Sequence, residues 1–230
     1  KRLATALQER KGGYEDYLIW LHQSNYFDLP TYSFASMGWD GEQWSTEATR
    51  SRDYTRLMTP EYFLAEFHGK QFGYPVQWLA EFFNREGQPP IGEKEIDSLL
   101  CLALITGTQE LTLAGNLGGQ HEYLREVIDR AAEFGLQEDD ARFIGWWENK
   151  KYLEKAPDYH RVKCSLWSRQ NGVLLMLGNA RSGTDMQVTV RIDREGVGLE
   201  GPVHGVEWWS EAPGEIKNDA LSVEAPGSGW

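Results

Sequence analysis

The sequence predicts an α/β fold with a parallel sheet over residues 1–140, followed by an all-β region, a small antiparallel β-sandwich, over residues 141–230. In the first part, apolar strand-like runs alternate with amphipathic helical segments, which is the order found in parallel sheets. In the second part, short runs with period-two alternation are separated by turn residues. With 230 residues, 40% of them apolar, the chain can form one large core or two smaller ones.

The first expected elements are a helix and a buried strand. Apolar residues at helical spacing predict a helix over residues 2–11, which Gly12-Gly13 ends. The run at residues 17–22 has the aromatic and β-branched content of a strand that is buried on both faces. A long polar and aromatic loop is expected from residue 23 to residue 44, and loops of this kind often carry function.

The next segments alternate between helix and strand. Thr59 as N-cap and Pro60 at the first helical position predict a helix that runs to about residue 72. The elements expected after it are a strand at 74–80, a helix at 93–106, a strand at 110–114 and a helix at 120–134. The last helix should end at Gly135. Its apolar face is expected to consist of Tyr123, Leu124, Val127, Ile128 and Ala131.

Short strands are expected throughout the second part. They are placed at residues 143–147, 160–168, 173–179, 186–192, 206–209 and 220–223. Asn171-Gly172 between two of them is the strongest short hairpin signal in the chain. Strand alternation would place one member of each Trp pair, 146–147 and 208–209, inside the sandwich, so core packing is favoured for them over carbohydrate binding.

The composition excludes several partners and cofactors. The chain has 23 basic and 35 acidic residues, a net charge of −12, which would repel nucleic acid and an anionic membrane surface. No run of about 18 apolar residues is present, so no transmembrane helix is expected. Cys101 and Cys164 lie in apolar surroundings typical of buried thiols. The five histidines lack close ligand spacing and no nucleotide-binding motif occurs, so we expect neither a metal nor a cofactor.

Five segments of the chain have a distinctive wording: Ile19-Trp20-Leu21-His22-Gln23-Ser24-Asn25, Leu29-Pro30-Thr31-Tyr32-Ser33-Phe34, Gly38-Trp39-Asp40-Gly41-Glu42, Trp78-Leu79-Ala80-Glu81-Phe82 and Phe143-Ile144-Gly145-Trp146-Trp147-Glu148-Asn149. Together these segments resemble the carboxyl-terminal portion of (β/α)8-barrel proteins related to glycoside hydrolase family 123. Their order along the chain carries the resemblance, which covers most of the sequence. It implies that the predicted α/β part is the last three βα units of a TIM-type barrel.

The resemblance also implies that other strands complete the fold. Three parallel strands cannot close a barrel, so the missing strands are expected from the same longer polypeptide or from a partner chain. Family 123 enzymes use an adjacent Asp-Glu pair in a substrate-assisted reaction, and no such pair follows a predicted strand here. That pair is therefore expected outside these residues. The family further implies a secreted protein, extracellular or periplasmic, that acts on polysaccharide.

Active sites in barrels lie at the carboxyl ends of the strands, which selects a set of candidate residues here. A sugar site needs carboxylates, polar groups that bind hydroxyls, and aromatic faces that stack on the ring. The candidate catalytic residues are Glu81, Glu42 and Asp40. The candidate substrate-binding residues are His22, Asn25, Asp28, Tyr32, Trp39 and Trp44.

Each of these candidates has a structural alternative. Glu81 could be a strand-end acid that pairs with Arg85, and Asp40 could cap the backbone of its own turn. His22 could be a hydrogen-bonded structural histidine. Together with the candidate residues, the resemblance implies a glycoside hydrolase acting on polysaccharide or on an aminosugar-containing glycan. The alternative is a non-catalytic carbohydrate-binding or assembly module.

Overall fold

The computed structural model describes most of the chain. The described residues are 9, 18–22, 34–67, 76–83, 86–108, 111–115, 120–155, 161–170, 172–180, 183–214, 216–217, 220–227 and 229, with the backbone alone for 111–115 and 154–155. The helix expected over residues 2–11 lies outside them except for Glu9. The structure is mixed α/β, with one parallel sheet and several antiparallel sheets, and the described residues contain no closed barrel.

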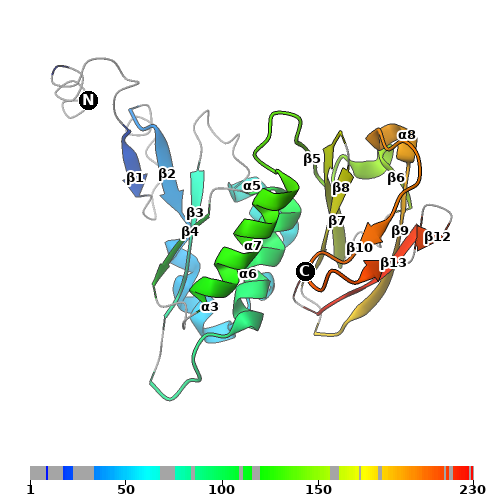
Figure 1. Ribbon diagram of the computed structural model, residues 1–230. Coiled ribbons are helices and arrows are strands. Elements are labelled where there is room, and N and C mark those ends of the chain that lie inside the picture. The colour runs from blue at the N-terminus through cyan, green and yellow to red at the C-terminus, as the bar shows by residue number, and fades with distance from the viewer. Residues whose placement is uncertain are drawn as a thin grey trace.

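The first part contains a parallel sheet of four strands in chain order (Figure 1). The strands are β1 (Trp20–His22), β2 (Met37–Asp40), β3 (Val76–Phe82) and β4 (Leu111–Gly115). The prediction of three strands was wrong, because β2 lies in the segment that was expected to be a loop. Its four residues include Gly38, a poor strand former, and they are ordered by pairing with β1 on one side and β3 on the other.

Five α-helices of the described part of the chain accompany these strands. They are α3 (Ser45–Ser51), α4 (Tyr54–Leu57), α5 (Pro60–Phe67), α6 (Glu93–Thr106) and α7 (His121–Phe134), and the 3-10 turn η2 (Glu42–Trp44) precedes them. The helix start predicted at Thr59 and the helix end predicted at Gly135 were correct, while the end predicted near residue 72 lies outside the described residues. Thr59 Oγ1 accepts a hydrogen bond of 3.0 Å from the amide of Tyr62 at the start of α5. Gly107 and Gly135 adopt left-handed conformations that end α6 and α7.

The larger core lies between one face of the parallel sheet and the helices. The alternating residues of β3 that face the helices are Val76, Trp78, Ala80 and Phe82, and all four belong to this core. Trp78 is completely buried against aromatic rings of α4 and α5. Gln77, Leu79 and Glu81 alternate with these residues and therefore point to the opposite face of the sheet.

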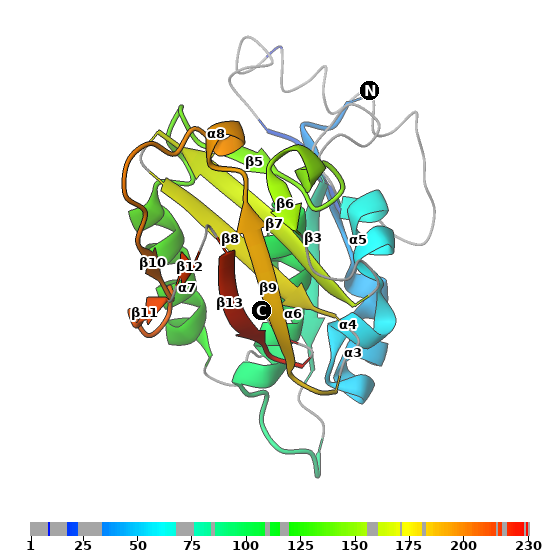
Figure 2. The same cartoon turned by 90° about the vertical axis from the view of Figure 1, so that its right-hand side faces the viewer.

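The second part consists of two antiparallel sheets and a short hairpin (Figure 2). One sheet contains β5 (Arg142–Ile144), β7 (Val162–Arg169) and β8 (Gly172–Asn179). The other contains β12 (Ile216–Lys217), β13 (Ala220–Ala225), β9 (Met186–Ile192) and β6 (Leu153–Lys155). The hairpin pairs β10 (Gly205–Val206) with β11 (Pro213–Gly214), and the short elements η4 (Asn149–Lys151) and α8 (Arg194–Val197) lie in connections. Residues from both sheets share one core, as expected for a sandwich.

Three local predictions in and near this part were wrong. Strand β5 ends at Ile144, and both members of the pair Trp146-Trp147 lie in the turn that follows it. Strand β10 likewise ends at Val206, so the strand alternation proposed for the two Trp pairs does not apply. Ile128 on α7 is 63% exposed, because the buried stripe of this helix is narrower than the predicted apolar face.

Helix α6 packs against both parts of the chain. One side of it belongs to the core of the parallel sheet, and the other side lies against β7 and β8. On that second side a Cβ atom added to Gly178 would lie 2.7 Å from Ile105 Cγ2 and 2.9 Å from Cys101 Sγ. Figure 1 shows α6 and α7 between the parallel sheet and the sandwich. The domain boundary at residue 140 stays a prediction.

Candidate functional site

Several predicted site residues lie together on the face of the parallel sheet that points away from the helices. We call this surface, formed by Trp20, His22, Trp39, Gln77 and Glu81, the distal face. Strand register places His22 beside Trp39 and Trp39 beside Gln77, and Glu81 lies on the same side of β3 as Gln77. Parallel pairing thus places His22 and Gln77, 55 positions apart in the sequence, on either side of Trp39, and Glu81 lies further along the same face of β3.

Polar and aromatic contacts connect the side chains of the first two strands with their surroundings. His22 Nε2 lies 2.7 Å from Glu42 Oε2, and both side chains are about half exposed. The indole Nε1 of Trp39 donates a hydrogen bond of 2.6 Å to Gln77 Oε1. The rings of Trp20 and Trp39 are 5.1 Å apart, and Trp20 is 47% exposed. The distal face therefore combines a histidine–carboxylate pair with an accessible aromatic surface.

Glu81 is the most unusual residue of the distal face. Its side chain lies near the carboxyl end of β3 and is only 9% exposed. Its Oε2 atom is buried and has no hydrogen-bond partner among the described residues. A buried carboxyl oxygen without a partner costs free energy, so such groups are rare in proteins and often belong to functional sites. The predicted alternative, a pair with Arg85, falls on a residue outside the described part of the chain.

Asp40 lies on the opposite face of the sheet from Glu81. Its Oδ1 atom accepts hydrogen bonds of 2.8 Å from the amide of Gly41 and 2.9 Å from Gln43 Nε2. This is the backbone-capping arrangement that was the alternative to a catalytic role. Asp40 pairs in register with Trp78, which faces the helices, so the two carboxylates do not share one surface.

A carboxyl pair on the helix side of the sheet was missed by the sequence analysis. Glu66 on α5 faces Asp40, and the Tyr62 hydroxyl forms a hydrogen bond with Glu66. Burial, followed by the charge of Asp40, raises the pKa of Glu66 from 4.5 to about 7. Burial, followed by the same two carboxylates, also raises the pKa of Tyr62. No local pattern could have identified Glu66, because its partner lies 26 residues earlier in the chain.

This pair predicts a pH-dependent stability. Because the pKa of Glu66 is higher in the folded protein than its ordinary value, its stabilising contribution is present below about pH 4.5 and is lost as the pH rises through about 7. We expect Glu66→Gln to increase the unfolding free energy by about 1 kcal/mol at pH 8 and by much less at pH 5, with the magnitude reduced by partial exposure. Urea unfolding at both pH values measures this difference. Glu86→Gln, at an exposed turn, is the control, and an equal effect of both variants would contradict the assignment.

The remaining predicted binding residues are divided between the helix side and undescribed segments. The ring of Trp44 meets Tyr62 edge-on at 5.7 Å and packs against the core of the parallel sheet. Its Nε1 atom is buried without a hydrogen-bond partner among the described residues. Asn25, Asp28 and Tyr32 lie outside the described residues. The structure therefore brings His22, Trp39 and Glu42 together, with Glu81 on the same face.

Other kinds of site find no support in the described part of the chain. No group of three or more His, Cys, Asp or Glu side chains there could hold a metal ion. Cys101 and Cys164 are buried free thiols, and burial raises the pKa of Cys101 and raises that of Cys164 to about 12, which disfavours a nucleophilic thiolate. Among the helices of the described residues, none has the length and apolar character needed to cross a membrane.

Comparison with known proteins identified no similar protein. No family model, no curated protein and no solved structure matches the chain.

Proposed function

We propose that this chain belongs to a glycoside hydrolase that acts on polysaccharide or on an aminosugar-containing glycan, with its active site over the distal face. The observation that carries the proposal is the Glu81 carboxyl group, which is shielded from water and whose Oε2 lacks a partner among the described residues. A glycosidic oxygen or a sugar hydroxyl would satisfy this atom. Polysaccharide as the substrate favours an extracellular or periplasmic location.

The proposed chemistry assigns different tasks to the two carboxyl groups. Glu81 donates its proton to the glycosidic oxygen as the bond between that oxygen and the anomeric carbon breaks, and a water molecule then adds to the anomeric carbon and returns a proton to Glu81. Glu42, which is held by His22, lies close to solvent and stabilises the positive charge that develops on the sugar ring. Trp20 and Trp39 offer faces on which the C–H surface of a pyranose can stack.

We also propose that further parallel strands complete the active site. Among the described residues, β1 and β4 each pair with one neighbour only, so the parallel sheet has two unpaired edges. Additional βα units of a longer polypeptide, or of a partner chain, would pair with these edges and close a barrel around the distal face.

A carbohydrate-binding module is the second candidate function. The exposure of Trp20 favours it, because an accessible aromatic ring binds a sugar without the help of any catalytic group. In that case Trp39, Gln77 and His22 would contact the sugar, and Glu81 would accept a hydrogen bond from a hydroxyl group. Such a module would retain glycan binding but release no product.

Hydrolysis by the complete polypeptide that contains these residues distinguishes the two functions. We expect release of reducing sugar from at least one member of a panel of aminosugar and neutral glycans. Glu81→Gln should lower the rate at least a hundredfold, and Glu42→Gln about tenfold, while glycan binding persists. Binding of a glycan without turnover of any panel member would favour the module. Unchanged rates in both variants would remove these carboxylates from the active site.

A further inference from the structure

The strand that carries Glu81 extends beyond its neighbour in the sheet. Strand β2 ends at Asp40, which pairs in register with Trp78, whereas β3 continues to Phe82. On its other side β3 remains paired with β4 as far as Phe82. The last residues of β3 therefore have backbone groups on the β2 side that no strand among the described residues satisfies, and buried groups of this kind need other partners.

Side chains from α3 and α4 take the place of the missing strand. The hydroxyl of Tyr54 donates a hydrogen bond of 2.8 Å to the carbonyl of Glu81 and accepts one of 2.9 Å from the amide of the same residue. The hydroxyl of Thr49 accepts a hydrogen bond of 2.8 Å from the amide of Phe83. The Tyr54 hydroxyl thus forms hydrogen bonds with both the amide and the carbonyl of Glu81, the proposed catalytic residue.

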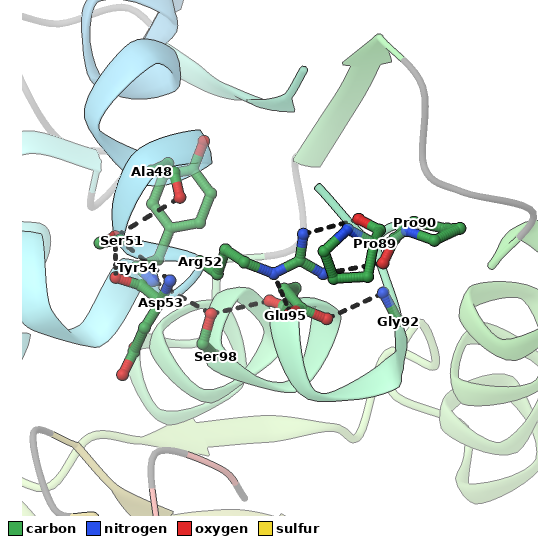
Figure 3. Close-up of polar contacts among 10 residues, drawn as sticks. All are labelled: Ala48, Ser51, Arg52, Asp53, Tyr54, Pro89, Pro90, Gly92, Glu95 and Ser98. Carbon is green, nitrogen blue, oxygen red and sulfur yellow. Dashed lines mark hydrogen bonds and ion pairs between the residues drawn. The ribbon is translucent and has the colours of Figure 1, made fainter. Parts of the chain in front are cut away.

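A network at the start of α4 fixes the other end of Tyr54 (Figure 3). The amide of Tyr54 donates a hydrogen bond of 3.0 Å to Ser98 Oγ on α6, and Ser98 Oγ donates to the carbonyl of Glu95. Arg52 bonds the Glu95 carboxylate at 2.6 Å and also donates to the carbonyl oxygens of Pro89 and Pro90. Arg52, two residues before Tyr54, is therefore tied to both α6 and the loop that precedes it.

Packing also restricts the motion of the Tyr54 ring, which lies between the bonded amide and the bonded hydroxyl of this residue. Tyr54 is completely buried, and its ring meets Trp78 at 5.1 Å and Phe82 at 5.0 Å, edge-on in both cases. Burial raises the pKa of its hydroxyl, so the phenol stays protonated and can serve as donor and acceptor at the same time. A hydroxyl held in this way fixes the backbone from which the Glu81 side chain projects.

We propose that Tyr54 is a positioning residue for Glu81, which sets the direction of the catalytic carboxyl group through the backbone at the end of β3. This inference rests on the proposed function, because it assigns Glu81 to catalysis. A Tyr54 that only fills the core would contribute to stability but would leave the turnover of folded enzyme unchanged. The two roles therefore predict different kinetics.

The test uses Tyr54→Phe in the complete polypeptide, which removes the hydroxyl and keeps the ring. We expect kcat on the best glycan of the panel to fall about tenfold and KM to stay within twofold, because a displaced carboxyl group slows the chemical step more than binding. Amide hydrogen exchange in the peptide that contains Glu81 should become at least tenfold faster. Thr49→Val is the matched control, since it frees the amide of Phe83 alone, and its kcat should stay within twofold.

The outcomes separate this inference from the proposed function. If Glu81→Gln abolishes turnover but Tyr54→Phe leaves kcat unchanged, the positioning role is wrong and the proposed function stands. An equal loss of kcat in Thr49→Val would also overturn it, because any loosening of β3 would then suffice. If Tyr54→Phe does not fold, Ser98→Ala, which removes the acceptor for the Tyr54 amide, provides the same comparison with a smaller expected loss of kcat, about threefold. An unchanged kcat in Ser98→Ala would then overturn the inference.

Discussion

Trp78→Ala is expected to lower the free energy of unfolding by about 4 kcal/mol, the largest effect of any substitution considered for this chain. The indole is completely buried at the centre of an aromatic cluster. Its ring lies 4.5 Å from that of Phe63, 5.1 Å from that of Tyr54 and 5.7 Å from that of Phe67. Alanine would leave a large cavity between β3 and α5, and the rings around it cannot all move inward. Urea unfolding measures the loss.

Trp78→Phe is the matched control for this prediction. Phenylalanine keeps an aromatic ring in the cluster and removes Nε1, which is buried without a hydrogen-bond partner among the described residues. We therefore expect a loss of only about 1–2 kcal/mol, since the smaller cavity is partly offset by the removal of a desolvated donor. A loss below about 2 kcal/mol in Trp78→Ala would contradict the central place of this residue in the core.

Gly41→Ala is expected to lower the free energy of unfolding by about 3 kcal/mol. Gly41 has a φ of 119°, a backbone conformation that residues other than glycine rarely adopt. An added Cβ atom would lie 2.5 Å from Trp78 Cδ1 and 2.9 Å from the carbonyl oxygen of Leu79. The turn would have to move away from β3 and would carry Glu42 with it. Loss of stability should therefore accompany loss of the contact between His22 and Glu42.

Gly87→Ala separates the two causes of this effect. Gly87 also has a positive φ, of 80°, but an added Cβ atom there would meet nothing within 4 Å. We expect it to lose about 1 kcal/mol, from backbone conformation alone. Thermal or urea unfolding of both variants provides the comparison. Equal losses of unfolding free energy in Gly41→Ala and Gly87→Ala would show that the close approach of Gly41 to β3 does not contribute to the effect of the substitution.

Elements with strong local signals could be predicted correctly from the sequence. The helix expected at residues 93–106 agrees with α6 at both ends, because a long apolar pattern is followed by Gly107 in a left-handed conformation. The strand expected at 186–192 agrees with β9 for the same reason, namely a clear period-two alternation. Antiparallel pairing of β7 and β8 confirms the hairpin expected around Asn171-Gly172.

Elements that depend on distant partners could not be predicted in this way. Strand β2 has only four residues, and its strand character comes from neighbours on both sides. The turn at Trp208-Trp209 was mistaken for a strand because aromatic residues are enriched in strands. In the structure Trp208 packs against the cluster of Trp167, Leu174 and Met176, while Trp209 meets Tyr123 of α7. Contacts between separate layers, rather than local propensity, determine these positions.

The candidate site was predicted in part. His22, Trp39 and Glu42 were chosen from one segment, and strand register and direct contacts do bring them together. Sequence position alone gave no indication that Asp40 and Glu81 lie on opposite faces, because that depends on the number of residues in each strand and on their pairing. Tyr54 was missed because it acts on the backbone of Glu81 from a separate helix, an interaction without a sequence signature.

The measurement that tests the central claim most directly is glycan hydrolysis by the complete polypeptide with Glu81→Gln. The rate of reducing-sugar release should fall at least a hundredfold, and the Kd for the same glycan should change less than threefold. Glu86→Gln, the same substitution at an exposed turn, should leave both values unchanged. An undiminished rate in Glu81→Gln would contradict the assignment of this buried carboxyl group to catalysis.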